Sequence, residues 1–139
     1  MKKISLALVL IILGSTTALA ASFSDVPESS PAYAAVESLK NLKIVTGYSD
    51  GTFKPDNPVN RVEAIKMILI SAKITDFASG SGSLFPDTPA DAWFAKYVLL
   101  AKTKSIVKGN PDGTFSPNRV VNKAEFLKML LNAFGKSMA

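Results

Sequence analysis

The 139-residue sequence contains no cysteine and no histidine. Without cysteine there can be no disulfide bond, no thiolate metal site and no thiol for lipid attachment at an export signal. Without histidine the chain lacks the commonest general base and metal ligand. Nucleophilic triads, zinc sites and thiol chemistry are therefore excluded. We expect no catalytic residue, no metal and no cofactor.

The excess of positive over negative charge is also small, with a formal net charge of +5. The basic residues are spread along the chain, whereas nucleic-acid-binding proteins usually present a concentrated basic face. The sequence therefore predicts no nucleic-acid partner. A weak positive balance suits a protein that works near anionic polymers, although it does not require one.

Residues 1–20 have the pattern of a cleavable export signal. Lys2 and Lys3 precede an apolar run over residues 5–13, and an Ala-Leu-Ala cleavage site ends at Ala20. A single membrane anchor is the alternative, but the run is shorter than the roughly 20 residues that a span needs. We therefore expect a secreted chain that has no contact with the membrane after cleavage.

The rest of the sequence is one unit written twice, at a spacing of 62 residues (85 − 23 = 62). No gap is needed over residues 23–72, and the matched residue types are chemically varied. The matches include Phe23 and Asp25 with Phe85 and Asp87, Gly47 with Gly109, residues 50–53 with 112–115, Glu63 with Glu125, and Lys66-Met67 with Lys128-Met129. Between the two copies, residues 78–83 are rich in glycine and serine, a composition typical of a flexible linker. We therefore divide the chain into a signal (1–20), a first repeat (21–73), a linker (74–84) and a second repeat (85–139).

Each repeat is predicted to contain two helices joined by a turn-rich segment. Apolar residues recur at helical spacing, first as Tyr33, Val36, Leu39 and Leu42, then as Trp93, Tyr97, Leu100 and Ala101. Gly47 and Gly109 are expected to end these helices as left-handed caps. The Asp-Gly pairs that follow predict tight turns. The expected fold is all-α, two helix–loop–helix repeats.

The second helix of each repeat has a clear predicted start. Asn60 and Asn122 are suitable N-caps, and Glu63 and Glu125 stand three residues later, which completes a capping box. These glutamates therefore have a structural explanation and are not taken as catalytic acids. Asp25, like its equivalent in the second repeat, precedes a proline turn and is expected to bond nearby backbone N–H groups.

The order of these features resembles the S-layer homology repeat. The shared pattern is Phe-x-Asp-Val, a helix, Gly-Tyr-x-Asp-Gly-Thr-Phe-x-Pro and then Asn-Arg-Val-Glu, and it is most specific over residues 47–63 and 109–125. The resemblance implies a helical bundle or spindle that holds exported proteins on the bacterial envelope. It also implies binding of wall polysaccharide, often through a pyruvate ketal carboxylate. Typical modules of the family carry three repeats, so here either the two units pack on each other or chains associate as a homo-oligomer to complete the bundle.

The signature arginine of that family maps onto Arg61 and, in the second repeat, onto Lys123. Both begin a predicted helix, where unpaired N–H groups and the helix dipole favour an anion. Arginine offers two-point recognition of a carboxylate and lysine only a point charge. We therefore expect the first repeat to bind an acidic sugar more tightly, while Lys123 could equally be a solvated surface charge. The predicted glycan-binding residues are Arg61, Lys123, Gly47, Asp50, Gly109, Asp112 and Trp93, the last as a ring that stacks on a sugar or simply packs in the core.

The leading hypothesis is a module at the cell wall or cell surface that binds an anionic wall polysaccharide or a peptidoglycan-linked glycan. The alternative is an assembly protein whose repeats make protein–protein contacts. A glycosidase with two carboxylates is remote, because turns and caps account for most of the acids.

Overall fold

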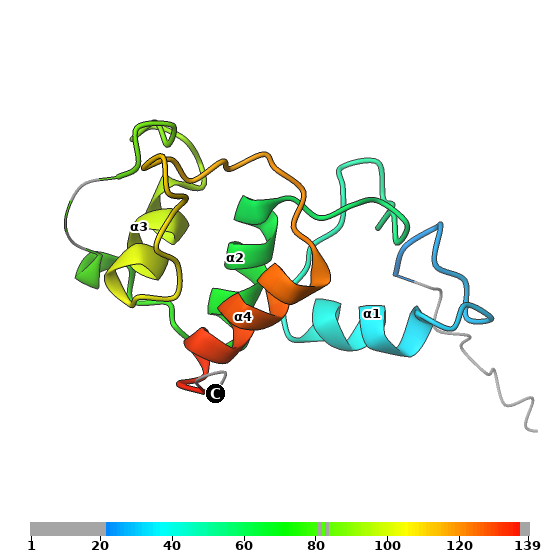
Figure 1. Cartoon of the computed structure of the whole chain (residues 1–139). Helices are drawn as coiled ribbons and strands as arrows, with labels where there is room; N and C mark the ends of the chain where they lie inside the picture. Colours follow the sequence, from blue (N-terminus) through cyan, green and yellow to red (C-terminus); the bar gives the residue numbers. More distant parts are fainter. Residues whose placement is uncertain (1–21, 81, 83, 137–139) are drawn as a thin grey trace, which may run out of the picture.

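The computed structural model describes residues 22–80, 82 and 84–136. This part of the chain folds into four α-helices and one short 3-10 helix (Figure 1). In chain order these are α1 (Tyr33–Asn41), α2 (Arg61–Ser71), η1 (Phe77–Ser79), α3 (Ala95–Thr103) and α4 (Lys123–Ala133). Within these residues there is no β-strand, only an isolated antiparallel bridge between Asn60 and Val120. The predicted all-α fold is confirmed.

The expected export signal, residues 1–20, lies outside the described residues. Among the helices that are described, none is long and apolar enough to cross a membrane. The predicted linker, residues 74–84, holds η1, whose Phe77 packs edge-on against Tyr97 of α3 at 5.0 Å between ring centroids. Part of this segment thus packs on the second repeat.

Helices α2 and α4 begin where the sequence predicted, because both capping boxes form. The Asn60 Oδ1 atom accepts the N–H of Glu63 at 3.0 Å, and the Glu63 carboxylate accepts the N–H of Asn60 at 3.0 Å. Asn122 and Glu125 repeat the pattern at 2.9 and 3.2 Å. Each box satisfies N–H groups that the start of a helix leaves without an intrahelical partner.

Helices α1 and α3 end earlier than predicted. After α1, Lys43 takes a φ of 58°, and the N–H of Ile44 bonds the carbonyl of Leu39 at 2.9 Å. This 6→1 bond is that of a Schellman cap, which satisfies a free carbonyl at the helix end. Ser105 ends α3 in the same way, with a φ of 57°. The prediction that glycines end these helices was therefore wrong.

The two glycines have another structural role. Gly47 and Gly109 have φ values of 69° and 85°, in the left-handed region that favours glycine. A Cβ on Gly47 would overlap the ring of Phe23, and one on Gly109 would lie 2.5 Å from the ring of Phe85. Each glycine therefore lets the first aromatic ring of its repeat lie directly against the backbone.

An aspartate near the start of each repeat holds the turn segment of the same repeat. Asp25 accepts the backbone N–H groups of Phe53 at 2.8 Å and Lys54 at 2.6 Å. Asp87 accepts the equivalent groups of the second repeat at the same distances. The sequence predicted backbone N–H partners, but these lie 28 and 29 residues along the chain and not nearby.

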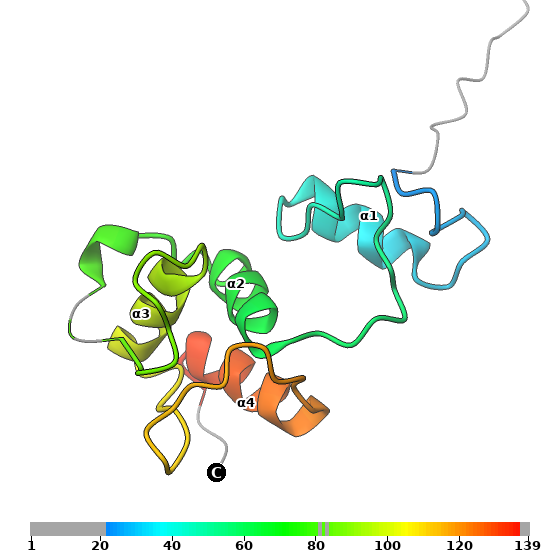
Figure 2. The ribbon, with the colours of Figure 1, turned by 90° about the horizontal axis from the view of Figure 1, so that it is seen from above.

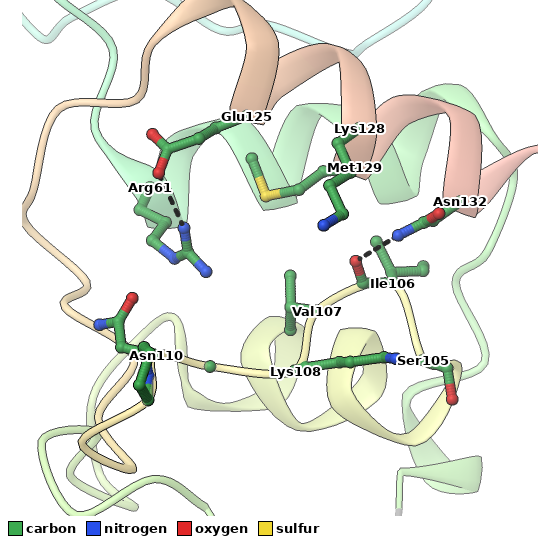
Figure 3. Close-up of a pocket in the computed structure, with 12 residues that line it drawn as sticks. Arg61, Ser105, Ile106, Val107, Lys108, Asn110, Glu125, Lys128, Met129 and Asn132 are labelled. Atoms are coloured by element: carbon green, nitrogen blue, oxygen red, sulfur yellow. Dashed lines mark hydrogen bonds and ion pairs between the residues drawn. The ribbon is translucent and has the colours of Figure 1, made fainter. Parts of the chain in front are cut away.

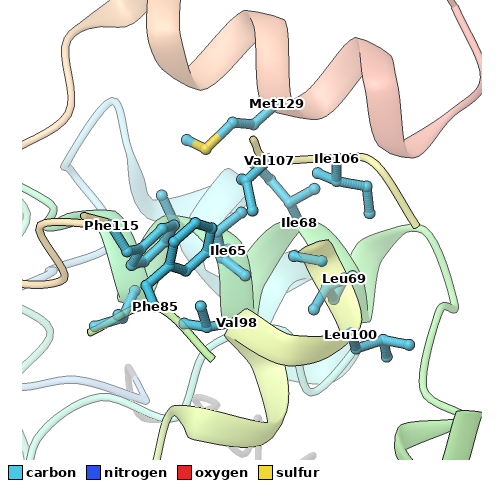
Figure 4. Close-up of a cluster of buried hydrophobic side chains, with 13 residues drawn as sticks. Ile65, Ile68, Leu69, Phe85, Val98, Leu100, Ile106, Val107, Phe115 and Met129 are labelled. Atoms are coloured by element: carbon cyan, nitrogen blue, oxygen red, sulfur yellow. The ribbon is translucent and has the colours of Figure 1, made fainter. Parts of the chain in front are cut away.

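The main core lies between α2, α3, one side of α4 and the loops of the second repeat (Figure 4). Helix α2 packs on both α3 and α4, whereas α1 packs on no other helix of the described part and stands apart from the other three (Figure 2). Side chains buried in this core include Ile65, Ile68, Leu69, Val98, Leu100 and Phe115. A smaller cluster around Phe23, Val26 and Val36 stabilises the first repeat.

The apolar stripe of α4 is only partly covered: Phe126 and Leu130 pack against the main core, but two other side chains of the stripe are exposed. Leu127 is 44% exposed and Phe134 is 52% exposed, and only Met129 of this helix is buried. In α2 the equivalent stripe is buried throughout its length. The two repeats therefore share a local fold but differ in what covers their second helix.

Candidate functional site

A cavity of about 500 Å³ lies between α4, the loop that follows α3, and the start of α2 (Figure 3). Its lining is mostly polar or charged. The lining residues are Arg61, Glu125, Lys128, Met129 and Asn132 from the helices, with residues 105–111 from the loop. We call it the junction cavity, because Arg61 belongs to the first repeat and the other lining residues belong to the second.

The Arg61 side chain is held at the edge of the junction cavity by packing. It is 8% exposed, and its guanidinium carbon lies 4.8 Å from the centroid of the Phe115 ring. Its Nη1 atom is 3.9 Å from Glu125, and its buried Nε has no hydrogen-bond partner. Burial lowers the pKa of Arg61, as does the nearby Arg119, while Glu125 opposes the shift. The group keeps its charge at neutral pH and has donors left for a ligand.

Glu125 is engaged mainly by a different arginine. Arg119 donates from Nη1 at 3.0 Å and from Nη2 at 2.5 Å to its two carboxylate oxygens. This forked contact lowers the pKa of Glu125 and raises that of Arg119. Sequence reasoning missed Arg119, because the equivalent position in the first repeat is Asn57 and the repeat comparison gave no signal.

Two lysines add positive charge to the junction cavity. Lys128 points from α4 into the space that Arg61 also faces (Figure 3). Lys108 lies on the loop that forms the opposite wall. In the described part of the chain neither lysine forms a salt bridge. Lys128 was not among the predicted binding residues, although the match of Lys128 with Lys66 in the repeat could have pointed to it.

The start of α2 does not offer free N–H groups. The N–H of Arg61 bonds the carbonyl of Arg119 at 2.9 Å, and that of Val62 bonds the carbonyl of Pro117 at 3.2 Å. The expectation of unpaired N–H groups at the start of α2 was therefore wrong, whereas the role of Arg61 in binding an anion stays a prediction. What Arg61 offers is its side chain, which the second repeat holds in place.

The other predicted residues are scattered. Lys123 is exposed at the start of α4 and lines neither the junction cavity nor a second, smaller cavity in the first repeat. Gly109 lines the junction cavity, and Gly47 lines the smaller one, of about 240 Å³. The structure therefore brings Arg61 and Gly109 together but leaves Lys123 apart from them.

Asp50 and Asp112 stabilise turns and line neither cavity. The N–H and hydroxyl of Thr52 donate to Asp50, which lowers its pKa to about 2. Thr114 does the same for Asp112 and also lowers its pKa. These carboxylates shape the two loops, since they fix the Asp-Gly turns that follow the lining segments.

The smaller cavity is the first-repeat equivalent of the junction cavity. Residues 44–48, Glu63, Lys66 and Met67 line it, and their counterparts 62 positions later line the junction cavity; residues 53–55 and 57–59 complete its wall. Trp93 closes one side, with 57% of its surface exposed and the Lys66 Nζ atom 5.8 Å from its ring centroid. Among the residues described, none takes the place here that Arg61 has in the junction cavity. We call it the incomplete cavity.

Comparisons with known proteins agree with this repeat geometry. The family described as S-layer homology domain matches residues 22–65 and 84–127. A surface layer protein of Brevibacillus choshinensis is 33% identical over 106 residues, which cover 72% of this chain and 9% of that protein. A cell surface protein of Thermoanaerobacter kivui is 31% identical over 116 residues, 81% of this chain and 15% of that protein.

A cellulosome-anchoring protein of Acetivibrio thermocellus is also similar, at 29% identity over 112 residues, or 78% of this chain and 25% of that protein. The chain thus spans a quarter or less of the length of these relatives. The family and its relatives place the chain at the cell surface. With the family pattern matched in both repeats, this chain belongs to the S-layer homology domain family.

Proposed function

We propose that the chain anchors at the cell wall by binding an anionic wall polysaccharide, with an acidic group of the glycan in the junction cavity. The observation that supports this most directly is the state of Arg61. Its guanidinium is almost buried, its Nε has no partner, and its contact with Glu125 is as long as 3.9 Å. A charged group with unused donors beside a cavity is suited to receive a carboxylate.

The shape and charge of the junction cavity fit a sugar acid. Its volume of about 500 Å³ lies within the roughly 300–1,000 Å³ range of ligand sites. Arg61 would supply two parallel N–H groups to one carboxylate, and Lys128 would add a second charge from α4. A pyruvate ketal on an aminosugar carries a compact carboxylate of this kind. Asn110 and Asn132 line the same cavity; their Nδ2 atoms donate within the protein, and their side-chain carbonyl oxygens would accept hydrogen bonds from sugar hydroxyls.

The two cavities are unequal in this proposal. Only the junction cavity holds an arginine, while the incomplete cavity offers Lys66 beside the exposed Trp93 ring, a face on which a sugar can stack. The tighter site is therefore formed by both repeats jointly. This differs from the expectation that the first repeat binds an acidic sugar more tightly than the second, because the site that holds Arg61 is lined mostly by the second repeat.

A binding role needs no catalytic group. Four carboxylates that a glycosidase mechanism could use already accept hydrogen bonds from the backbone. Asp25 and Asp87 bond N–H groups of the turn segments, and Glu63 and Glu125 bond the N–H groups of the N-cap residues. We therefore propose a non-enzymatic anchor. The alternative, an assembly protein, draws support from the exposed apolar side chains on α4.

Sedimentation with purified cell walls tests the proposal. Lys128→Ala should weaken wall binding about tenfold, and Arg61→Lys, which keeps the charge but loses the fork, should weaken it by a similar factor, equivalent to about 1.4 kcal/mol. Lys104→Ala is the matched control, because Lys104 is exposed and lines neither cavity. Walls stripped of acidic polymers should no longer retain the chain. Equal retention by stripped walls would refute the proposal.

A further inference from the structure

The uncovered face of α4 is the counterpart of a face that is buried on α2. Ala124, Leu127 and Lys123 are exposed, whereas their equivalents 62 positions earlier, Val62, Ile65 and Arg61, are all buried. Within the part of the chain that the structure describes, the same local sequence thus has a covering partner in the first repeat and none in the second.

The structure shows what covers the first of these faces. Residues 117–121 of the second repeat lie across the start of α2, where Pro117 and Arg119 accept N–H groups through their carbonyls. The N–H of Val121 donates to the carbonyl of Val59 at 3.0 Å, and Asn60 forms a bridge with Val120. This contact is a short antiparallel pairing between the two repeats.

The first repeat carries an equivalent of this covering segment, and it is free. Residues 55–58 are exposed, whereas Pro117, the counterpart of Pro55, is buried. The carbonyls of Pro55 and Asn57 and the N–H of Val59 have no hydrogen-bond partner among the residues that the structure describes. The complementary groups on the second repeat, the N–H groups of Lys123 and Ala124 at the start of α4, are unpaired in the same part of the chain.

The free segment already has the docking conformation. Lys54 has a φ of 59° and its counterpart Ser116 a φ of 56°. The N–H of Asn57 bonds the carbonyl of Lys54 at 3.0 Å, and the N–H of Arg119 bonds the carbonyl of Ser116 at 3.1 Å. Because the loop is preformed, ordering it would cost little of the binding free energy.

The incomplete cavity lies beside this free segment. In the junction cavity Arg61 lies over the ring of Phe115, which is fully buried. In the incomplete cavity the equivalent ring, Phe53, is only half-buried and no arginine covers it. By the spacing of the repeat, the residue that covers Phe53 as Arg61 covers Phe115 would belong to a unit placed before the first repeat. The residue of this chain that is equivalent to Arg61 is Lys123, 62 positions later, and a second copy of the chain could supply it.

We propose that a second copy of this chain docks the start of its α4 on residues 55–59 and so completes the incomplete cavity with its Lys123. The N–H groups of Lys123 and Ala124 would bond the carbonyls of Asn57 and Pro55, and the Val59 N–H would bond the carbonyl of Val121. Lys123 would then lie over Phe53, as Arg61 lies over Phe115. The role of the completed cavity as a second acidic-glycan site rests on the proposed function, but the docking itself does not.

The contact is head-to-tail, because it joins the second repeat of one chain to the first repeat of another. A chain therefore has one docking face and one receiving face, and two such contacts are needed to close a ring. Either a closed ring or a longer array would present several anion sites to one polymer, which raises avidity without a new kind of contact.

Light scattering or sedimentation velocity on the purified chain, from about 1 to 500 µM, tests the docking. The weight-average mass should rise to that of two chains or more. Ala124→Glu should hold the mass at that of one chain, because it buries a charge at the contact while an acidic residue in the first turn suits the helix. Ala34→Glu is the matched control, since the counterpart Lys96 stays exposed when the two repeats pack. A mass of one chain throughout, or equal effects of both variants, would overturn the proposal.

Cysteine pairs give a second measurement in a chain that has no native thiol. The equivalents of the bridged pair Asn60 and Val120 are Asn122 and Pro58, and such a pair brings Cα atoms within disulfide reach. A mixture of Asn122→Cys and Pro58→Cys chains, each shown to be folded by circular dichroism, should form a two-chain disulfide under mild oxidation. A mixture of Asn122→Cys with Ala34→Cys should not. Equal yields would overturn the proposed contact.

Wall binding separates this inference from the proposed function. Lys123→Gln should leave the mass unchanged and reduce retention on purified walls several-fold. If the mass rises but Lys123→Gln binds walls like the parent chain, the completed second site is refuted. If instead Lys128→Ala leaves wall binding intact, the proposed function fails while the docking stands on its own measurement.

Discussion

The carboxylate of Asp25 accepts the backbone N–H of Phe53, 28 positions further along the chain, at 2.8 Å. This bond ties the start of the first repeat to its turn, and the hydrogen bond from Phe53 lowers the pKa of Asp25. The carboxylates of Asp50, Asp112 and Glu125 also have lowered pKa values because they accept hydrogen bonds in the folded state. The fold therefore depends on ionised carboxylates.

We predict that this dependence appears as acid destabilisation. A carboxyl group whose pKa is lower in the folded chain stabilises the fold above its unfolded pKa of about 4 and loses that effect as the pH falls through the folded pKa. The free energy of unfolding should therefore fall between about pH 4 and pH 2, the value to which the pKa of Asp50 is lowered. Thermal unfolding from pH 2 to 6 measures it. Asp25→Asn should show a shallower dependence on pH, and a profile parallel to that of the parent would contradict the assignment.

Two glycines of the second repeat should differ in their tolerance of alanine. Gly109 and Gly113 both have positive φ, so each substitution costs about 1–2 kcal/mol in backbone strain. A Cβ on Gly113 meets open space, whereas one on Gly109 meets the Phe85 ring, which adds about 1–3 kcal/mol. Urea unfolding of Gly109→Ala and Gly113→Ala measures the difference. Equal destabilisation would show that the ring moves aside.

The two capping glutamates should not be equivalent. Glu63 and Glu125 both hold the N–H of their N-cap residue, but only Glu125 also pairs with Arg119. Glu125→Gln should therefore lower the free energy of unfolding by about 0.5–1 kcal/mol more than Glu63→Gln, which serves as its control. Most of the excess should disappear in an Arg119→Ala background, where only the longer contact of Glu125 with Arg61, at 3.9 Å, is left. An excess that persists there would place its origin outside this pair.

Wall binding should weaken as salt is added. The attraction between an acidic glycan and the cations of the junction cavity is screened at the exposed Lys128 more than at the nearly buried Arg61. Retention on walls should fall between about 0.05 and 0.5 M NaCl, a range over which the Debye length shrinks from about 14 to 4 Å. Lys128→Ala should show a weaker salt dependence, whereas Lys104→Ala should follow the parent. A salt-independent retention would argue for apolar contacts instead.

Local sequence signals predicted much of the fold. The capping boxes at Asn60 and Asn122 were found from spacing alone, because a cap needs only residues three positions apart. The predicted ends of α1 and α3 were wrong, because Lys43 and Ser105 adopt a left-handed backbone conformation that is uncommon for lysine and serine. Glycine was the reasonable expectation for that conformation, but here it serves ring packing.

The candidate site was harder to predict, because it depends on how the repeats meet. Arg61 was identified by its position in a family pattern, but the free N–H groups that we expected beside it at the helix start are paired. Nothing in the sequence shows that the carbonyls of Pro117 and Arg119 take those N–H groups, since that pairing is long-range. Lys128 could have been found from its match with Lys66, whereas Arg119 has no such match.

The position of Arg61 has a consequence for how such chains arise. Its guanidinium belongs to one unit but lies in a cavity walled by the next, so a complete cavity of this kind exists only where two units meet. A row of units has one meeting point fewer than it has members, and a lone unit has none. An ancestral single unit would have had to share the site with a neighbouring molecule. Gene duplication would then have placed that shared site within one polypeptide for the first time.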